Sequence, residues 1–423
     1  MFESSDSHAA KVDCPHLGKL FNPLVEPQLN NPYPFYARAR KEEPIFFSDL
    51  LGAWVLTRYD DVVSILRQPD IFSSRDVLRP VASWASEVFQ ILANDSAMLV
   101  PVVVNTDGKE HSRFRTPLKQ AFLPSRVKAM EETIRTVAGR LVDAFYEEGG
   151  TDLVANFTGP LTQEVILRMF DIPQEDIAQC KRWSDDYLDL ISAPLALERQ
   201  LECAHSVVAF NAYMADLAEK RSKRLGEDVV SCLLASHDDK ARPLSRAEVV
   251  ANLAGVLMAG HETTTGMLSS ALYRLLSPPG RWRHVCMNPR IIPSAIEEAL
   301  RFDGANCFYR TALRDVQVGG IFIPEGSLLL LASASANHDE AHFENAEQFD
   351  LGRSPNQHLA FGHGTHYCVG ASLGRLEGRI AVEVLSQRLP DLRLQPDQQI
   401  SYRPNLLGRR LDQLIVTWGQ YAE

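Results

Sequence analysis

Apolar side chains recur at helical spacing along most of the chain, and this pattern predicts a protein built mainly from α-helices. A capping box formed by Ser245 and Glu248 begins one long helix, which continues to Ser277 and spans ~45 Å at about 1.5 Å per residue. A second long helix ends before Pro390. Further helical patterns cover 59–66, 126–147, 160–170, 174–192 and 198–224.

Short runs rich in β-branched and aromatic residues predict a small β region. Residues 45–47 and 54–57 suggest a hairpin, and strands over 316–323 and 327–334 flank a turn. Residues 76–104 show no clear period, so we expect a long loop, which is usually functional when it is rich in aromatic residues. No repeat or linker divides the chain. We therefore expect a mainly α, α+β fold that forms a single domain over 1–423.

Composition excludes several classes of protein. The formal net charge of −11 argues against nucleic-acid binding and against binding to anionic membranes. The seven cysteines are scattered and form no C-x-x-C pair, which indicates a reducing compartment. The N-terminus lacks the regions of a signal peptide, and no stretch reaches about 18 consecutive apolar residues. We expect a soluble cytoplasmic protein without a membrane anchor.

The glycine-rich stretch 358–370 delivers one cysteine, Cys368, to the start of the helix that ends before Pro390. Unpaired N–H groups and the positive end of the helix dipole at that position favour a thiolate. Glycines at 362, 364 and 370 permit close approach of a flat ligand. Two other readings compete: Cys368 as a small buried apolar residue, and His358, His363, His366 and Cys368 as a zinc or copper site.

The residues from Phe361 to Gly370 read F-G-x-G-x-H-x-C-x-G, which resembles the haem-binding signature of the cytochrome P-450 family. Six fixed positions would arise by chance in about one chain of this length in 10⁵. The resemblance extends over about residues 20 to 418 and implies the family's helix-rich triangular prism. It also implies haem b as the cofactor, with Cys368 as the thiolate ligand of iron and Phe361, Gly362 and Gly370 as cofactor contacts.

A second motif lies in the middle of the 246–277 helix, where the chain reads Ala259-Gly-His-Glu-Thr. It resembles the family's oxygen-binding groove, in which Ala259 and Gly260 contact the cofactor. The resemblance implies Glu262 as the acid of a proton relay and Thr263 as the hydroxyl beside bound dioxygen. Glycine and threonine are poor helix formers, so we expect a local widening of the helix here. The competing interpretation is a bend with a solvated glutamate.

Four basic residues match positions that hold the haem propionates in the family, and charge-assisted bonds of arginine to carboxylate suit that role. They are His111, Arg115, Arg310 and His366.

Glu298 and Arg301 lie three residues apart on a predicted helix, a pattern that occurs about once by chance in a chain of this length. By resemblance they form the family's structural salt bridge, which Arg353 completes. We expect this group to hold the Cys368 loop in place. His338 replaces an arginine that is common at its position in the family.

The resemblance implies a substrate pocket for a small, mostly apolar organic molecule. Its predicted lining comprises Trp84, Phe89, Leu188, Ile191, Asn306, Phe308 and Leu406.

The implied activity is that of a monooxygenase, EC 1.14, that uses O2 to hydroxylate, O-dealkylate or epoxidise its substrate. No fused reductase is visible, so we expect electrons from NAD(P)H through a separate ferredoxin or flavodoxin with its reductase, docking near His363. A peroxide-using haem-thiolate enzyme would share the fold but usually lacks the pair formed by Glu262 and Thr263. A non-catalytic haem sensor would keep Cys368 but would need no proton relay through Glu262 and Thr263.

Overall fold

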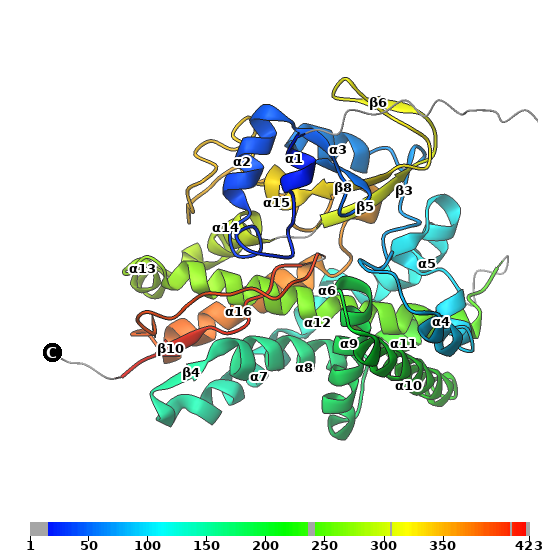
Figure 1. The fold of residues 1–423 in the computed structure, drawn as a ribbon. Helices are drawn as coiled ribbons and strands as arrows, with labels where there is room; N and C mark the ends of the chain where they lie inside the picture. The colour runs from blue at the N-terminus through cyan, green and yellow to red at the C-terminus, as the bar shows by residue number, and fades with distance from the viewer. Residues whose placement is uncertain (1–15, 236–241, 305–306, 407, 420–423) are drawn as a thin grey trace, which may run out of the picture.

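The longest helix, α12 (Arg246–Leu276), crosses the middle of the molecule in the computed structural model (Figure 1). The structure describes residues 16–235, 242–304, 307–406 and 408–419. Ser245 and Glu248 begin α12 as the sequence predicts: the Ser245 Oγ accepts from the Glu248 amide at 3.3 Å, and the Glu248 carboxylate accepts from the Ser245 amide at 2.7 Å. Most of its residues are buried.

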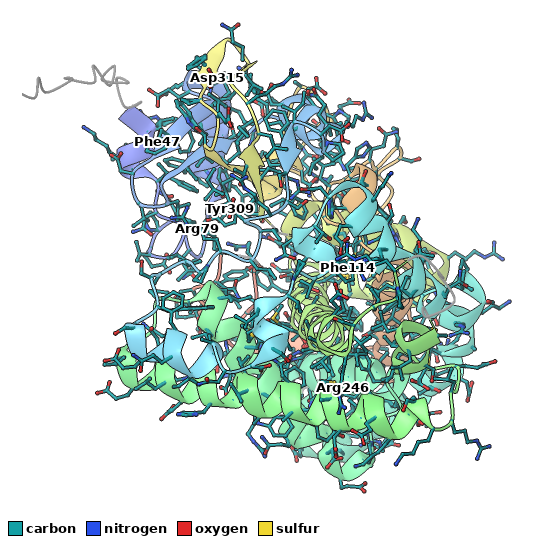
Figure 2. The ribbon with its side chains drawn as sticks, turned by 90° about the vertical axis from the view of Figure 1, so that its right-hand side faces the viewer. Phe47, Arg79, Phe114, Arg246, Tyr309 and Asp315 are labelled. Atoms are coloured by element: carbon teal, nitrogen blue, oxygen red, sulfur yellow. The ribbon has the colours of Figure 1, made fainter. Side chains whose placement is uncertain are left out.

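Among the helices that pack directly against α12 are α8 (Gly159–Met169), α9 (Ile177–Ser192), α10 (Leu197–Ser222), α14 (Ile292–Asp303) and α16 (Ala371–Arg388). Side chains fill the space between these helices in one large apolar core that also includes the fully buried Phe114 (Figure 2). The remaining helices are α1 (His16–Leu20), α2 (Tyr33–Glu42), α3 (Tyr59–Leu66), α4 (Ser86–Leu92), α5 (Gly108–Ala121), α6 (Pro124–Ala129), α7 (Glu131–Phe145), α11 (Val229–Leu234), α13 (Arg281–Met287) and α15 (Ser333–Ala336).

The β region is small and lies largely on one side of the helices (Figure 1). A five-stranded sheet has the order β1-β2-β8-β5-β3, in which β2 pairs with β8 in parallel and the other neighbours are antiparallel. Its central strand β8 is buried along its whole length. The strands are β1 (Ile45–Ser48), β2 (Ala53–Leu56), β3 (Phe72–Ser73), β5 (Cys307–Ala312) and β8 (Leu328–Ala332).

Two smaller sheets complete the fold. β10 (Ile415–Thr417) lies between β4 (Gly150–Asp152) and β9 (Arg393–Leu394), so the end of the chain pairs with a segment far earlier in sequence. β6 (Val316–Val318) and β7 (Ile321–Ile323) form a separate hairpin.

Three local predictions were wrong. The segment 316–323 is two strands and not one, because Gly319 and Gly320 adopt positive φ and turn the chain back. The loop 76–104 contains helix α4 and two short 3-10 turns, which are too short to give a readable period. The middle of α12 is an unbroken α-helix and shows no widening. Its threonines bond to carbonyls one turn earlier and leave the backbone ladder intact.

No single helix among the described residues is long and apolar enough to cross a membrane. One strongly bent pair, Ser86–Leu92 with Ser96–Asn105, passes the same test by length and composition.

Candidate functional site

Backbone geometry fixes the loop that carries Cys368. The Cys368 amide donates to the Phe361 carbonyl at 2.8 Å and closes the loop on itself. Gly362 and Gly364 have φ of +71° and +70°, a left-handed conformation that favours glycine. A Cβ at Gly364 would lie 2.8 Å from the Leu66 carbonyl oxygen, so this glycine also lets the loop pack tightly against α3.

The Cys368 sulfur lies in desolvating surroundings, yet the residue keeps exposed surface. Burial raises the pKa of its thiol, whereas amides of Gly370 and Ala371 at the start of α16 and the Arg115 guanidinium lower that pKa. A group that is both remote from bulk water and uncovered by neighbouring side chains faces an internal space. The sulfur is therefore accessible to a ligand held inside the protein, with N–H donors in place to stabilise a thiolate.

Phe361 and Gly370 flank this sulfur in the chain. The Phe361 ring lies under the Arg375 guanidinium, 4.6 Å from its carbon to the ring centroid, and packs against Gly374. Gly370 has a φ of −84° that any residue can adopt, and a Cβ there would lie 3.9 Å from the sulfur. Of the predicted glycines, Gly362 is therefore required by backbone conformation, and Gly370 is not.

Two side chains of α5, His111 and Arg115, each have a buried nitrogen atom without a hydrogen-bond partner close to this loop. His111 on α5 is 2% exposed and its Nε2 makes no hydrogen bond. Burial, with the charges of His366 and Arg115, lowers the pKa of His111 to about 4. Arg115 also has an unpartnered buried Nε, although its other end donates to the Tyr367 carbonyl. Such unsatisfied buried donors are rare and point to an acceptor that the protein itself does not supply.

Arg310 and His366 lie near His111 and Asp107. Arg310 on β5 is 6% exposed, donates to the Tyr309 carbonyl at 2.7 Å, and has a pKa that burial lowers to about 10. The His366 ring lies 4.2 Å from the ring of His111, centroid to centroid. Together with Arg115, these side chains fit a dianionic group such as the two propionates of a haem.

Asp107 is a residue of this region that the sequence interpretation missed. His366 Nε2 lies 2.8 Å from the Ser74 hydroxyl and 3.5 Å from the Asp107 carboxylate, which also accepts bonds from Ser73 and Ser74. Burial raises the pKa of Asp107, but the hydrogen bonds from His366, Ser73 and Ser74 outweigh it and hold the pKa well below its usual range. An ionised Asp107 therefore orients the His366 ring, and nothing in the local sequence signals that contact.

On α12, Ala259 and Thr263 are exposed although Leu257, Met258 and Thr265 around them are buried. Exposed positions in the middle of a helix that crosses the molecule indicate an open internal space on that face. The Thr263 Oγ1 donates to the Ala259 carbonyl at 2.8 Å, which leaves its lone pairs directed to that space.

Gly260 serves packing in this structure. A Cβ at Gly260 would lie 2.9 Å from the Ile166 side chain, so the glycine lets α8 approach α12 closely. The reason for a glycine at this position is therefore helix contact, whatever its distance from a cofactor.

Glu262 is paired with a residue that lies far away in sequence. Both of its carboxylate oxygens accept from Arg410 Nη1, and the side chain is 13% exposed. It lines a cavity of about 380 Å³ together with Asp185 and Leu188 of α9 and Arg403. The predicted relay acid thus stands between the inside of the protein and a cavity on its α9 side, and its arginine partner could not be found from local sequence.

Glu298, Arg301 and Arg353 form one buried ionic network. Arg301 Nε and Nη2 donate to the two oxygens of Glu298 at 2.9 and 2.8 Å, and both side chains are fully buried. Arg353 Nε donates to the same carboxylate at 3.0 Å. Arg301 also donates to the carbonyls of Asn337, Ala346 and Gln348. The network therefore ties α14 to the long segment that precedes the Cys368 loop.

The predicted pocket residues fall in different apolar clusters. Trp84 donates to the Leu190 carbonyl at 2.8 Å and packs beside Phe89, which is 56% exposed. Ile191 is buried next to that cluster, and Leu188 lines the cavity beside Glu262.

The other predicted pocket positions lie nearer the β region. Phe308 is half-buried, and its ring would contact a Cβ at Gly362 at 3.7 Å, so it reaches the Cys368 loop. Leu406 is buried in the cluster that contains Tyr309 and Leu330. Asn306 lies outside the described residues.

The histidine-rich loop does not assemble the alternative zinc or copper site. His358 bonds to Glu297 at 3.1 Å, His363 accepts from Arg67 at 3.0 Å, and His366 contacts Ser74 and Asp107. Each histidine is oriented by a different neighbour, so their nitrogens do not converge on Cys368. Within the described ranges, the ligand atoms that come together lie elsewhere, at Asp185, His261 and Glu262.

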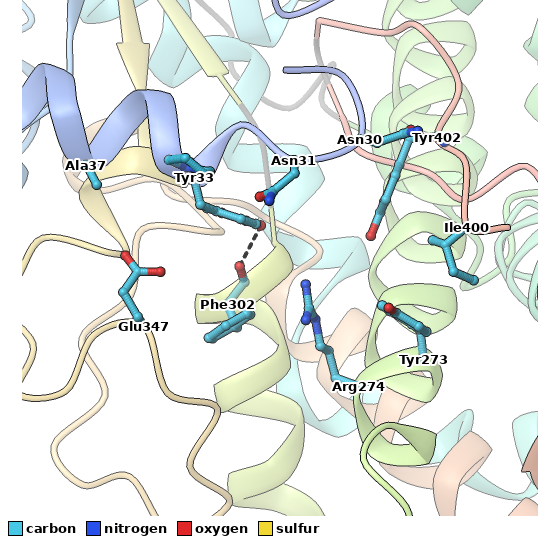
Figure 3. Close-up of a pocket in the computed structure, with 11 residues that line it drawn as sticks. Asn30, Asn31, Tyr33, Ala37, Tyr273, Arg274, Phe302, Glu347, Ile400 and Tyr402 are labelled. Atoms are coloured by element: carbon cyan, nitrogen blue, oxygen red, sulfur yellow. Dashed lines mark hydrogen bonds between the residues drawn. The ribbon is translucent and has the colours of Figure 1, made fainter. Parts of the chain in front are cut away.

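His338, which replaces an arginine common at its position in the family, is buried and contacts several neighbours. Its Nε2 lies 2.8 Å from the Phe302 carbonyl, and its ring stacks on Tyr33 at 4.2 Å between centroids. The nearby cleft of about 450 Å³ is lined by Tyr33, Arg274, Phe302 and other residues of α2, α12 and α14 (Figure 3). None of the predicted site residues that the structure describes lines this cleft.

Comparisons with known proteins identify the family of the chain. The family model described as cytochrome P450 matches residues 53–283 and 288–408. The mycinamicin IV hydroxylase/epoxidase of Micromonospora griseorubida is 34% identical over 86% of this chain and 89% of its own length. The nocardicin C N-oxygenase of Nocardia uniformis subsp. tsuyamanensis is 32% identical over 94% of this chain and 98% of its own length.

A solved structure shows the same fold. The P450 haem domain of Tepidiphilus thermophilus superposes with a TM-score of 0.91 at 32% identity, covering 95% of this chain and 97% of that one. The mainly helical fold with a small β region is thereby confirmed, as is the resemblance first read from the Cys368 motif. The chain belongs to the cytochrome P450 family.

Proposed function

We propose that the protein is a haem-thiolate monooxygenase that oxidises a small, mostly apolar organic molecule with O2 and electrons from a separate redox partner. Family membership already makes the chain a haem-iron oxidoreductase of the monooxygenase class. The observation that carries the finer proposal is the accessible Cys368 sulfur, set in desolvating surroundings at the N-terminal end of α16.

The residues around that sulfur fit a haem. Cys368 would hold the haem through its iron, and His111, Arg115, Arg310 and His366 would hold the propionates, since the buried His111 Nε2 and Arg115 Nε have no protein partner. When bound, a thiolate-ligated haem supplies the redox chemistry that uses two electrons and two protons to place one oxygen atom of O2 in the substrate and the other in water.

The chain itself must deliver the two protons. Thr263 presents its hydroxyl on the open face of α12, bonded to the Ala259 carbonyl, and so can pass a proton inward. Glu262 directly precedes Thr263 in the chain. It borders the cavity on the α9 side, from which water can reach its carboxylate. Arg410 holds the Glu262 carboxylate, so proton transfer along this route requires Glu262 to loosen that contact.

Electrons would come from NAD(P)H through a ferredoxin or flavodoxin and its reductase. Arg67 lies at the Cys368 loop, where its Nε donates to His363, and would present positive charge to an acidic carrier. The relatives named as a hydroxylase/epoxidase and as an N-oxygenase support oxygen insertion and leave open the kind of bond attacked.

Isotope incorporation distinguishes this proposal from its rivals. Haem-loaded protein is incubated with a library of apolar candidate substrates, ferredoxin, reductase, NADPH and ¹⁸O2, and products are analysed by mass spectrometry. We expect one ¹⁸O atom per product and no product without reductase. Equal product from peroxide alone would indicate a peroxygenase. Ligand-induced spectral change without product under either condition would indicate a haem sensor.

A further inference from the structure

Three potential metal ligands converge on the face where α9 meets α12. Asp185 of α9 and His261 and Glu262 of α12 place ligand atoms within 4.8 Å of one another. The His261 Nε2 lies 3.3 Å from Asp185 Oδ1 and 3.5 Å from Glu262 Oε2. One imidazole nitrogen and two carboxylate oxygens at this spacing surround a common point at which an ion could sit.

Two of these side chains have unsatisfied polar atoms. His261 is 2% exposed and its Nδ1 makes no hydrogen bond. Asp185 Oδ1 is buried and also makes none, although it faces the imidazole at 3.3 Å, because the angles of that contact do not meet those of a hydrogen bond. The unsatisfied Nδ1 is not the imidazole nitrogen that faces the carboxylates, so only Asp185 Oδ1, which faces His261 Nε2, bears on the ion. Buried polar atoms in native proteins nearly always have a partner, and this oxygen indicates that a partner other than the protein belongs beside it.

The site has an entrance. Asp185 and Glu262 line the cavity of about 380 Å³, whose wall is otherwise formed by Arg182, Asp186, Leu188, Asp189, Arg199 and Arg403. Charged and polar walls keep such a cavity hydrated, so an ion can arrive with its water molecules. The space also admits the water that would complete a four-coordinate shell.

We propose that Asp185, His261 and Glu262 bind a divalent transition-metal ion of the Zn²⁺ type. An imidazole with two carboxylates suits zinc, whereas calcium and magnesium prefer sites made of oxygen alone. Lys181 contacts only Oδ2 of Asp185, so Asp185 Oδ1 stays free for the ion. Arg410 Nη1 donates to both oxygens of Glu262, so Glu262 binds the ion in competition with Arg410.

Two cations lie against the carboxylates of the site, Arg410 at Glu262 and Lys181 at Asp185. The two neighbouring cations reduce the affinity of the site and predict binding that is reversible and not structural.

Binding would have a mechanical result. The ion would join α9 to α12 immediately before Thr263 and would occupy the carboxylate of Glu262. We infer that zinc fixes α9 against α12 and withdraws Glu262 from proton transfer.

Equilibrium dialysis of haem-loaded, chelator-treated protein against Zn²⁺ tests the proposal, with bound metal counted by mass spectrometry. We expect one zinc per chain at this site, and affinity lowered at least about 10-fold in His261→Gln and in Asp185→Asn, since loss of even an outer partner of a ligand costs 10–100-fold. Arg410→Gln should bind zinc more tightly, because it removes a competing cation from Glu262. His284→Gln, an exposed histidine on α13, is the matched control and should bind as the wild type does.

Amide hydrogen exchange gives a second readout that is independent of activity. Zinc should slow exchange in residues 181–189 of the wild type and not in Asp185→Asn. Absence of zinc binding would overturn the proposal, as would binding that neither His261→Gln nor Asp185→Asn weakens. Should His261→Gln fail to fold, the Asp185→Asn and Arg410→Gln variants decide the matter through their opposite signs.

Discussion

Replacing Glu298 by glutamine tests how the fold holds the loop that carries Cys368. Glutamine keeps the volume and one oxygen of glutamate but removes the charge. Glu298 accepts bonds from Arg301, Arg353, Asn356 and the Asp350 amide, so the substitution disturbs the whole network at once.

The expected cost is large because Arg301 is fully buried. Its guanidinium would lose the charge that compensates it, and breaking a buried ion pair from one side costs about 3–5 kcal/mol. Set against a typical total stability of about 5–15 kcal/mol, this loss is a large fraction. We therefore expect the Glu298→Gln variant to unfold at clearly lower urea concentration and to retain less haem.

A second substitution separates charge from hydrogen bonding. All five N–H donors of Arg301 are used, two on Glu298 and three on the carbonyls of Asn337, Ala346 and Gln348. Arg301→Lys keeps the charge but has three donors, so at least two buried acceptors lose their partner at about 1–3 kcal/mol each.

Urea unfolding followed by circular dichroism gives the free energies, and the haem absorbance per chain gives cofactor retention. Glu42→Gln is the control, because the exposed pair of Arg38 and Glu42 should contribute less than about 0.5 kcal/mol. A Glu298→Gln variant within about 1 kcal/mol of the wild type, with full haem content, would refute the role assigned to the network.

Three further predictions concern the site and its surroundings. Thr263→Ala should keep NADPH consumption but lower the product formed per NADPH several-fold, measured by product and cofactor assays. The control is the neighbouring Thr264→Ala. An equal yield of product per NADPH in the two variants would contradict the proton relay. Gly364→Ala should destabilise the protein by about 1–3 kcal/mol in urea unfolding, because the residue has φ of +70° and its new methyl would lie 2.8 Å from a backbone oxygen of α3; an unchanged midpoint would contradict this. Burial raises the pKa of Glu297, but hydrogen bonds from His358 and a neighbouring arginine lower it to about 2. The wild type should therefore exceed Glu297→Gln in stability by about 1–2 kcal/mol above pH ~4.5, after allowance for solvent screening, with the difference vanishing as pH falls towards 2; a difference that does not depend on pH would count against the ionised pair.

Sequence alone predicted where several parts of the candidate site begin because its motifs are local. The spacing from Phe361 to Gly370 predicts a thiol near a helix start, and the structure puts Cys368 two residues before Gly370, the N-cap of α16. The capping box at Ser245 likewise marks where α12 begins. Such signals depend on neighbours in the chain, so periodicity and capping chemistry suffice to find them.

Contacts between distant segments could not be predicted. Arg410 pairs with Glu262, from which it is separated by 148 positions in sequence. Asp107, the residue before α5, contacts His366 of the Cys368 loop. The reason for Gly260 is the Ile166 side chain of α8, which only the packed structure brings near. Long-range pairing depends on the arrangement of whole elements, and a single sequence carries no direct record of it.

Local predictions failed where an element was short. The hairpin of β6 and β7 has three residues in each strand, and its turn at Gly319 and Gly320 was taken as part of one strand. Helix α4 has seven residues, about two turns, which is too few to show a period of 3.6.

The account depends most on a bond between the Cys368 sulfur and haem iron, and the absorption spectrum of the reduced carbon-monoxide complex tests it directly. We predict the long-wavelength Soret band of thiolate ligation for the purified, haem-loaded protein, and its loss in Cys368→His. A colourless wild type after haem-replete expression, or a carbon-monoxide spectrum like that of a histidine-ligated globin, would contradict the account.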